Sequence, residues 1–133
     1  MKWYLSAHAE DLRNWVNRQY PNRDKTSDGS VGDQAHATRA SDHNPDPTST
    51  PPGCVRAIDI DADLKPGAKD RSEAARLAET LRDQAKRRVR PIAYIIYNGR
   101  IASAKSLWRW RPYTGLNPHK AHIHVSFHPD SKE

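Results

Sequence analysis

The sequence predicts a small α+β domain with a mostly antiparallel sheet, two main helices and a long proline-rich loop. Two stretches place apolar residues at helical spacing, and shorter apolar or alternating stretches are typical of strands. These elements follow one another as helix, long loop, strand, helix, hairpin and strand. With 133 residues, including four Trp and five Tyr, the chain can bury one modest core. We therefore expect a single domain spanning residues 1–133.

The first helix is expected to start at Ser6, a good N-cap residue, and to end before Pro21. Its apolar positions are Leu12, Trp15, Val16 and Tyr20. Residues 22–52 follow almost without apolar side chains and contain four prolines, which forbid regular structure. A loop of this length in a small domain is usually functional or disordered.

The second half of the chain carries the predicted sheet. Residues 55–60 form a first strand, and Asp70 and Glu73 form a capping box for a helix that extends to about Val89. The apolar stripe of this helix is Ala74, Leu77, Ala78, Leu81, Ala85 and Val89. Residues 92–97 and 100–104 form a hairpin around a type I′ turn at Asn98 and Gly99. After a Trp-rich loop at 106–120, residues 122–127 form the last strand.

Net charge, cysteine content and hydropathy limit the partners and the cellular setting that this chain can have. The net charge of +6 favours anionic partners such as nucleic acid, membrane surfaces or anionic wall polymers. Cys54 is the single cysteine, so an internal disulfide is excluded. No apolar run reaches the length of a membrane span, and the N-terminus lacks the apolar core of a signal peptide. We expect no membrane insertion and synthesis in the cytoplasm.

His122 and His124 are the first candidate metal ligands. The two-residue period of a strand places both imidazoles on one face of the last predicted strand. Burying two imidazoles together costs free energy unless they bind something. Such pairs also occur by chance on exposed strands, so the pair alone is a weak indication of a metal site.

Asp59 and His43 are further candidate metal ligands, which strengthen the metal interpretation of His122 and His124. Asp59 lies within an apolar strand, where a carboxylate is costly unless it is paired or binds metal, although an Asp at a strand end can also hydrogen-bond a loop. Asp61 shares its face and is either a supporting residue or the true ligand. His43 lies in a polar loop, where a histidine is often solvent-exposed. Two His and one Asp would supply the three protein ligands of a catalytic zinc.

These residues resemble a known family. Ser41-x-His43, Ala57-Ile58-Asp59 and His122-x-His124 resemble the motifs of zinc peptidases of the D-alanyl-D-alanine carboxypeptidase and L-alanyl-D-glutamate endopeptidase type. That group also includes lysostaphin-type enzymes and the hedgehog signalling domain. The run from Gly32 to Pro45 further resembles peptidase domains of actinobacteriophage endolysins.

The resemblance implies a role for each matching position. It makes His43, Asp59 and His124 the zinc ligands. His122 becomes the catalytic imidazole that holds the attacking water or stabilises the tetrahedral intermediate. Arg39 becomes the cation that clamps the scissile carbonyl or a substrate carboxylate, with Arg23 and Lys25 as the alternatives.

The sequence departs from the family pattern in two places. Fifteen residues separate His43 from Asp59, more than the family's usual spacing, so the proline-rich segment must fold away as a loop. Many members carry a carboxylate three residues before the final zinc histidine as general base, and this chain has Ala121 there. A His-x-His variant without that carboxylate exists in the family, and in it His122 would take the role.

The resemblance implies a zinc-dependent peptidase that hydrolyses peptide bonds in peptidoglycan stem peptides or cross-links, as the catalytic domain of a phage endolysin. Made in the host cytoplasm, it would act as a monomer on the bacterial cell wall, with no nucleic-acid partner. Two alternatives stay open. A metal-dependent nuclease would use the basic charge and His43-Asn44, and a non-catalytic zinc module that binds the wall would explain Ala121.

The remaining chemistry-bearing residues are weaker candidates. His36 is either a supporting residue or a ligand of a second metal. Cys54 could ligate zinc, but its place in a proline-glycine loop favours a spectator thiol. We expect surface positions for His8, His119 and His128. The aromatic residues Trp108, Trp110 and Tyr113 either line a substrate groove or pack in the core.

Overall fold

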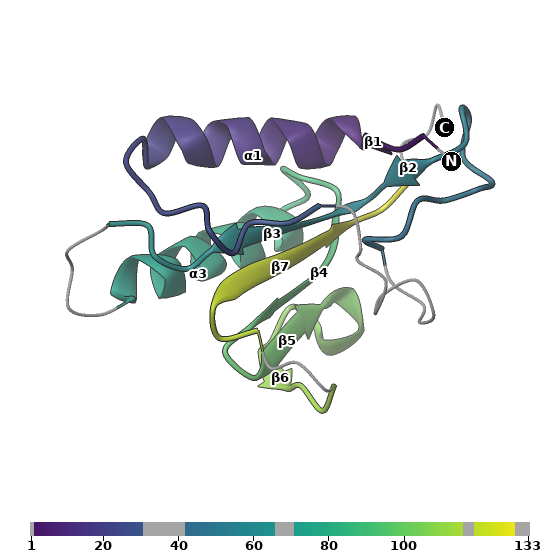
Figure 1. Cartoon of the computed structure of the whole chain (residues 1–133). Coiled ribbons are helices and arrows are strands. Elements are labelled where there is room, and N and C mark those ends of the chain that lie inside the picture. The colour runs from purple at the N-terminus through teal and green to yellow at the C-terminus, as the bar shows by residue number, and fades with distance from the viewer. Residues whose placement is uncertain (1, 31–41, 66–70, 116–118, 130–133) are drawn as a thin grey trace.

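The chain forms a five-stranded sheet with two helices, in a computed structural model that describes residues 2–30, 42–65, 71–115 and 119–129 (Figure 1). The sheet order is β3-β7-β4-β5-β6, and each neighbouring pair is antiparallel. Its strands are Ala57–Asp61 (β3), Ile92–Tyr97 (β4), Arg100–Ser103 (β5), Arg111–Pro112 (β6) and His122–Phe127 (β7). The predicted α+β class is confirmed.

Two helices and a small second sheet complete the described fold. The helices are Ala7–Gln19 (α1) and Ser72–Lys86 (α3), and a short 3-10 turn spans Ala104–Ser106 (η1). Tyr4–Leu5 (β1) pairs in parallel with Cys54–Val55 (β2). Neither helix has both the length and the apolar character that a bilayer span requires.

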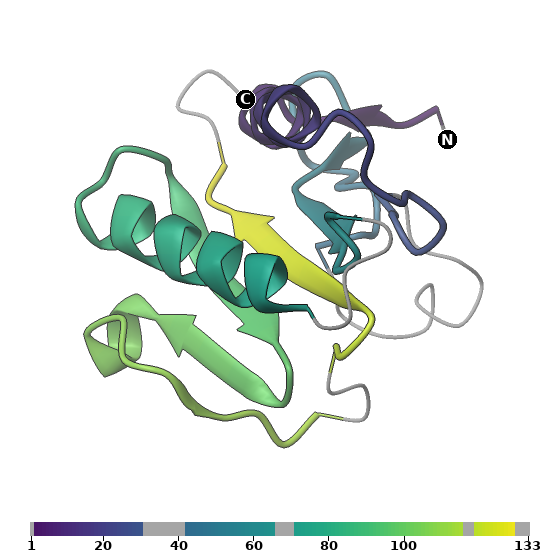
Figure 2. The same cartoon turned by 90° about the vertical axis from the view of Figure 1, so that its left-hand side faces the viewer.

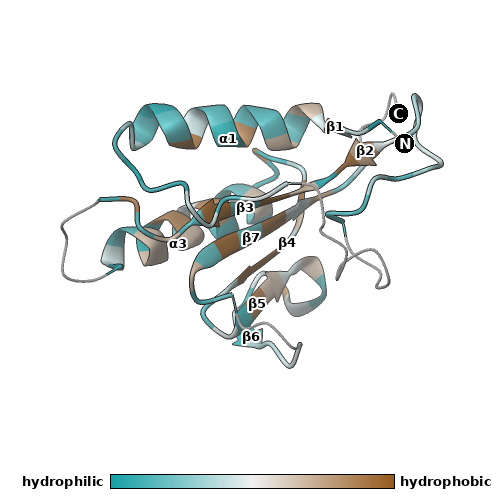
Figure 3. Cartoon of the chain, in the orientation of Figure 1, coloured by the Kyte–Doolittle hydropathy of each residue, from teal (hydrophilic) through white to brown (hydrophobic). Residues whose placement is uncertain are grey.

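The hydrophobic core lies on one face of the sheet, between the sheet and the two helices. Strands β3, β7 and β4 contribute Ile58, Ile60, Ile95, Ile123 and Val125, all at most 1% exposed. The helices contribute Ala9, Leu12 and Val16 from α1, and Ala74, Leu77, Ala78, Leu81 and Ala85 from α3. Figure 2 shows α3 lying across the sheet, and Figure 3 shows hydrophobic residues concentrated on β3, β7 and β4.

The opposite face of β3 and β7 carries polar side chains. Because successive strand residues alternate between faces, Asp59 and His124 point away from the core residues beside them. Asp59 and His124 are also direct cross-strand partners. Loop residues lie against β3 here, since Gly29 forms an isolated antiparallel bridge along the edge of the strand and the side chain of His43 reaches Asp59 and His124 on this face. The candidate ligands therefore lie between the sheet and the loops rather than in the apolar core.

The predicted strand at 55–60 is divided in the structure. Val55 pairs with Leu5 in the small sheet, whereas Ala57 starts β3. Between them, the backbone N–H of Arg56 turns to the carbonyl of Asp42 (3.1 Å), while its own carbonyl still accepts from the N–H of Phe127 on β7 (2.8 Å). Pairing with the N-terminal segment was not visible in the local sequence pattern.

The second helix is shorter than predicted at its C-terminal end. It ends at Lys86, and Arg88 adopts a left-handed conformation with φ 59°. Val89 is therefore not part of the apolar stripe and is 65% exposed. At the other end, Arg71 is the N-cap residue and makes no side-chain capping bond, and Asp70 lies outside the described residues.

Two local predictions are confirmed by backbone geometry. The hydroxyl of Ser6 accepts a hydrogen bond from the N–H of Ala9 (3.2 Å), as an N-cap does. Asn98 and Gly99 have φ of 53° and 76°, the two positive values that a type I′ turn requires. This turn joins β4 to β5 and aligns the pairs from Tyr94 to Tyr97.

Candidate metal centre

Three donor atoms meet on the polar face of the sheet. The Nε2 atom of His43 lies 3.2 Å from Oδ1 of Asp59 and 3.1 Å from Nδ1 of His124, and that Nδ1 lies 3.2 Å from the same oxygen. Tetrahedral zinc with bonds of about 2.05 Å keeps its ligand atoms about 3.3 Å apart. The triangle therefore has the size of one face of a tetrahedral site, and these residues could hold a metal ion.

Strand pairing and a closed loop bring the donors together. Asp59 on β3 and His124 on β7 are cross-strand partners, and His43 comes from the loop that covers them. The long segment between His43 and Asp59 closes at its base, where Asp46 bridges to Cys54. The side chains of His43 and Asp59, at the two ends of this segment, are therefore adjacent despite the fifteen residues between them, as the metal assignment requires.

The base of this proline-rich loop is held by specific contacts. Asp46 donates its N–H to the carbonyl of Cys54 (2.9 Å) and accepts from the N–H of Gly53 (2.7 Å). Its carboxylate accepts from Nη1 of Arg56 (2.6 Å) and from the hydroxyl of Thr48 (2.7 Å). These bonds hold the pKa of Asp46 down at about 2, with Thr48 contributing most and Arg56 next. Asp46 is thus ionised at neutral pH.

Outer hydrogen bonds direct the lone pairs of both histidines toward the centre. The carbonyl of Ser30 lies 2.6 Å from Nδ1 of His43, so this nitrogen carries the proton and Nε2 presents its lone pair. The hydroxyl of Ser126 lies 2.8 Å from Nε2 of His124 and can accept its proton, which leaves Nδ1 as the inner lone pair. Two nitrogen lone pairs and a carboxylate oxygen then face one another, an arrangement that favours a bound cation.

The pKa directions agree with a centre that attracts positive charge. Burial alone would raise the pKa of Asp59, but hydrogen bonds from His124 and His43 hold it well below its usual range. Burial lowers the pKa of His43, but the hydrogen bond and charge of Asp59 outweigh burial and leave it raised. In the metal-free protein the centre is therefore an ionised carboxylate that favours a proton, or another cation, on His43.

A second ionic contact anchors the loop that carries Ser30. The guanidinium of Arg23 is buried and binds both carboxylate oxygens of Asp28 (2.8 and 2.6 Å). Asp28 also accepts from the N–H of Asp61 (2.8 Å), which fastens this loop to the end of β3. Arg23 is thereby held in a buried ion pair with Asp28.

Asp61 supports the site rather than completing the triangle. Its carboxylate accepts hydrogen bonds from the backbone N–H groups of Ser27 (2.9 Å) and Asp63 (2.8 Å). Of the two readings open from sequence, the supporting role is therefore the one that the contacts favour. Asp61 keeps the 27–30 segment against β3, where the carbonyl of Ser30 reaches His43.

His122 lies beside the triangle on the same strand face as His124. Its Nε2 atom is 3.5 Å from Oδ2 of Asp59, the carboxylate oxygen that does not face His43. Burial is the main cause of the lowered pKa of His122. Arg39 and His36 lie outside the described residues, and Lys25 is exposed.

His119 is a member of the site that the sequence interpretation missed. Expected at the surface, its ring is instead partly buried, 5.1 Å from that of His122 and 5.3 Å from that of His124. Its backbone carbonyl accepts from the N–H of Asn98 (2.9 Å), which ties it to the β4–β5 turn. Its position three residues before His122 was the available signal, but the loop conformation was not predictable.

Tyr94 contacts the centre through its ring. It stacks on His124 at 5.5 Å with an interplanar angle of 17°. Burial raises the pKa of Tyr94 to about 12, so its hydroxyl stays protonated. Tyr97 packs in the core on the opposite face, in agreement with the alternation of the strand.

The tryptophans of the 106–120 loop pack against the helix rather than the metal centre. Trp108 is 8% exposed within the core, and its carbonyl accepts from Nη1 of Arg82 on α3 (2.9 Å). The indole N–H of Trp110 donates to Glu79 on the same helix. Tyr113 lies near the centre, with its ring 5.8 Å from that of His119. Cys54 is buried in β2 and is not part of a disulfide.

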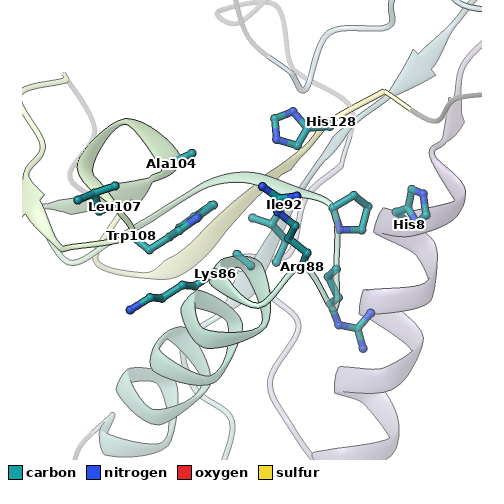
Figure 4. Close-up of a pocket in the computed structure, with 11 residues that line it drawn as sticks. His8, Lys86, Arg88, Ile92, Ala104, Leu107, Trp108 and His128 are labelled. Atoms are coloured by element: carbon teal, nitrogen blue, oxygen red, sulfur yellow. The ribbon is translucent and has the colours of Figure 1, made fainter.

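A separate cavity of about 780 Å³ lies away from the triangle (Figure 4). His8, Arg88, Trp108 and His128 are among its lining residues. His8 and His128 therefore do not belong to the metal centre; His128 is exposed, as expected, and His8 is partly buried.

Comparison of the chain with protein-family models, curated proteins and solved structures finds no match.

Proposed function

We propose that this chain is a zinc-dependent peptidase that hydrolyses peptide bonds in the stem peptides or cross-links of bacterial peptidoglycan, as the catalytic domain of a phage endolysin. The observation that carries the proposal is the triangle of His43, Asp59 and His124 with His122 beside it. The sequence resemblance to zinc peptidases of the cell wall supports the choice of substrate.

Two imidazoles and one carboxylate are a donor set that suits zinc. His43, Asp59 and His124 would hold three positions of a tetrahedral ion and leave the fourth open, as catalytic sites do. A zinc ion bound there would lower the pKa of a coordinated water to about 7 and polarise a peptide carbonyl. The hydrogen bonds that the imidazoles donate to the Ser30 carbonyl and the Ser126 hydroxyl fix the orientation of both rings.

His122 is placed to move the proton that peptide hydrolysis requires. Because burial lowers its pKa, the imidazole is neutral near pH 7 and can accept a proton from the attacking water. The nearby carboxylate of Asp59, 3.5 Å away, stabilises the imidazolium that results. His122 can then return the proton to the leaving amine, a role that Ala121 cannot perform.

The net charge of +6 suits an anionic wall polymer and the free carboxylates of stem peptides. In this proposal Arg39 contacts a substrate carbonyl or carboxylate, as the resemblance implies. The chain acts on the wall as a monomer after synthesis in the host cytoplasm.

Mass spectrometry of purified peptidoglycan after digestion tests this function. With one equivalent of zinc the protein should create new peptide termini, and a chelator should abolish them. His122→Ala should bind zinc normally but cleave roughly a hundredfold more slowly, because proton transfer is lost. Asp59→Asn should lose both zinc and cleavage.

The same digestion separates the alternatives. Intact peptidoglycan with stoichiometric zinc bound would contradict the peptidase and leave a non-catalytic wall-binding module. Metal-dependent cleavage of plasmid DNA, with no new peptide termini, would instead identify a nuclease.

A further inference from the structure

Asp59 has a second group of donors on its other side. The ligand atoms of Asp59, His119 and His122 lie within 4.8 Å of one another, and all three side chains are partly buried. Oδ1 of Asp59 faces His43 and His124, whereas Oδ2 faces Nε2 of His122 at 3.5 Å. The two donor groups thus share one carboxylate but use different oxygens.

The backbone holds His119 in place for this group. It has a left-handed conformation with φ 57°, which a residue with a β-carbon adopts only when its surroundings require it. Its carbonyl is bound by the N–H of Asn98 in the β4–β5 turn. The rings of His119 and His122 meet edge to face, with centroids 5.1 Å apart and an interplanar angle of 87°.

A carboxylate that presents one oxygen to each of two donor pairs can bridge two cations. Bridged metal pairs in enzymes have ions about 3.5–4 Å apart. Two imidazoles and a carboxylate oxygen form a donor set for zinc and neighbouring first-row metals. The second group therefore has the composition of a metal site in its own right.

We propose that Asp59, His119 and His122 form a second, weaker divalent-metal site, and that filling it inhibits the hydrolysis carried out at the first. The second site fills later because it shares its carboxylate with the first and because two cations at this separation repel each other. It inhibits because the nitrogen of His122 that must accept a proton becomes a ligand instead. The inhibitory part rests on the proposed peptidase function, and the site itself does not.

Calorimetric titration of the chelator-treated protein with zinc tests the site without any substrate. The wild-type protein should bind two equivalents in two resolved steps, and His119→Asn should retain the tight step alone. Asn suits this position because it tolerates the left-handed conformation of His119. The matched control His128→Ala, which removes a histidine of the separate cavity, should keep both steps.

One equivalent in the wild-type protein, or two in His119→Asn, would overturn the second site. Far-UV circular dichroism establishes that the variant is folded. If it is not, cobalt in place of zinc decides the matter in the wild-type protein, since two successive changes in visible absorption are expected and a single change contradicts the site.

The inhibitory part is measured as the ratio of the cleavage rate in excess zinc to the rate at one equivalent. In the wild-type protein this ratio should fall roughly a hundredfold below one, because His122 no longer transfers a proton. In His119→Asn the ratio should stay near one. Two bound equivalents with an unchanged ratio would refute the inhibition alone. No cleavage at any zinc level would refute the proposed function, while the titration still decides the second site.

Discussion

The inner nitrogen of each ligand histidine is set by the hydrogen bond on its outer nitrogen. The Ser30 carbonyl binds Nδ1 of His43, and the Ser126 hydroxyl lies against Nε2 of His124. The two histidines consequently use different ring nitrogens toward the same centre. Changing an outer partner should therefore weaken metal binding without removing a ligand.

Ser126→Ala tests this at the level of one residue. Loss of the hydroxyl leaves Nε2 of His124 without this partner in a fully buried position, so the tautomer with the inner lone pair becomes less favourable. We expect zinc affinity to fall by about 10–100-fold and the free energy of unfolding to fall by about 1–3 kcal/mol. Competition with a chelating dye measures the affinity.

Ser106→Ala is the matched control, because its hydroxyl contacts the carbonyls of Ser103 and Arg109 near η1, away from the centre. It should leave zinc affinity unchanged. An affinity for Ser126→Ala equal to that of the control would show that the Ser126 contact does not orient His124.

Asp59, His122 and His124 could be proposed from sequence because each carries its own signal, whereas His43 was identified through the resemblance of its motif. His122 and His124 share a strand face, and Asp59 stands out in an apolar strand. Ser126 and Ser30 had no such signal, since a serine hydroxyl or a backbone carbonyl is chemically ordinary until the fold brings it to an imidazole. His119 was assigned to the surface because its loop conformation depends on distant contacts.

At the scale of elements, the centre depends on the pairing of β3 with β7 and on the closed loop before β3. The strand pairing places Asp59 opposite His124, and the bridge between Asp46 and Cys54 allows His43 to return to the same point. The length of the loop is therefore not a barrier to metal binding. The loop's contacts with the N-terminal segment should influence the site indirectly.

Gly53→Ala should disturb this closure. Gly53 has φ 106°, and an added β-carbon would lie 2.2 Å from the carbonyl oxygen of Lys2. We expect a loss of about 3 kcal/mol in the free energy of unfolding, measured by urea titration. Weaker zinc binding should accompany it, because Gly53 also donates to Asp46.

Gly99→Ala separates backbone strain from the steric clash. Gly99 also has a positive φ of 76°, but an added β-carbon there meets no atom of the described chain within 4 Å. The free energy of unfolding of this variant should fall by about 1 kcal/mol, and its zinc affinity should stay unchanged. Equal losses for the two variants would contradict the close approach of Gly53 to Lys2.

Local sequence signals predicted the helices and the hairpin. The pairing of strands from distant parts of the chain could not be predicted from local patterns. The cap at Ser6 and the turn at Asn98 and Gly99 are determined by neighbouring residues. The division of the strand at Arg56 follows from pairing with Leu5, some fifty positions earlier. Likewise, α3 ends at Lys86 although the helical spacing of apolar residues in the sequence continues to Val89.

At the scale of the whole molecule, the hydrophobic core lies on one face of the sheet and the candidate metal ligands lie on the other. The helices cover the apolar face, and a loop brings His43 to the face that carries Asp59 and His124. A cation between these groups binds the folded chain alone, because the three donors come from distant parts of the sequence. Zinc should therefore stabilise the fold, by about 4 kcal/mol at a thousand times its dissociation constant.

This stabilisation should increase with pH. In the metal-free protein the pKa of His43 is raised, so its proton stabilises the fold below about pH 6.5, and that contribution is lost as the pH rises through the raised pKa. Zinc needs the unprotonated imidazole, so protons compete with it at low pH. The rise in melting temperature on adding zinc should be small at about pH 5.5 and largest near pH 8. A rise that is independent of pH would indicate that the metal binds elsewhere.

The most direct test of the metal centre is the zinc K-edge X-ray absorption spectrum of the protein loaded with one equivalent of zinc. His43, Asp59 and His124 predict nitrogen and oxygen neighbours at about 2.0–2.1 Å, with the outer-shell scattering of two imidazoles. A sulfur neighbour at about 2.3 Å would assign the metal to Cys54, the one cysteine of the chain. Either that result or a shell of oxygen without imidazole scattering would contradict the account.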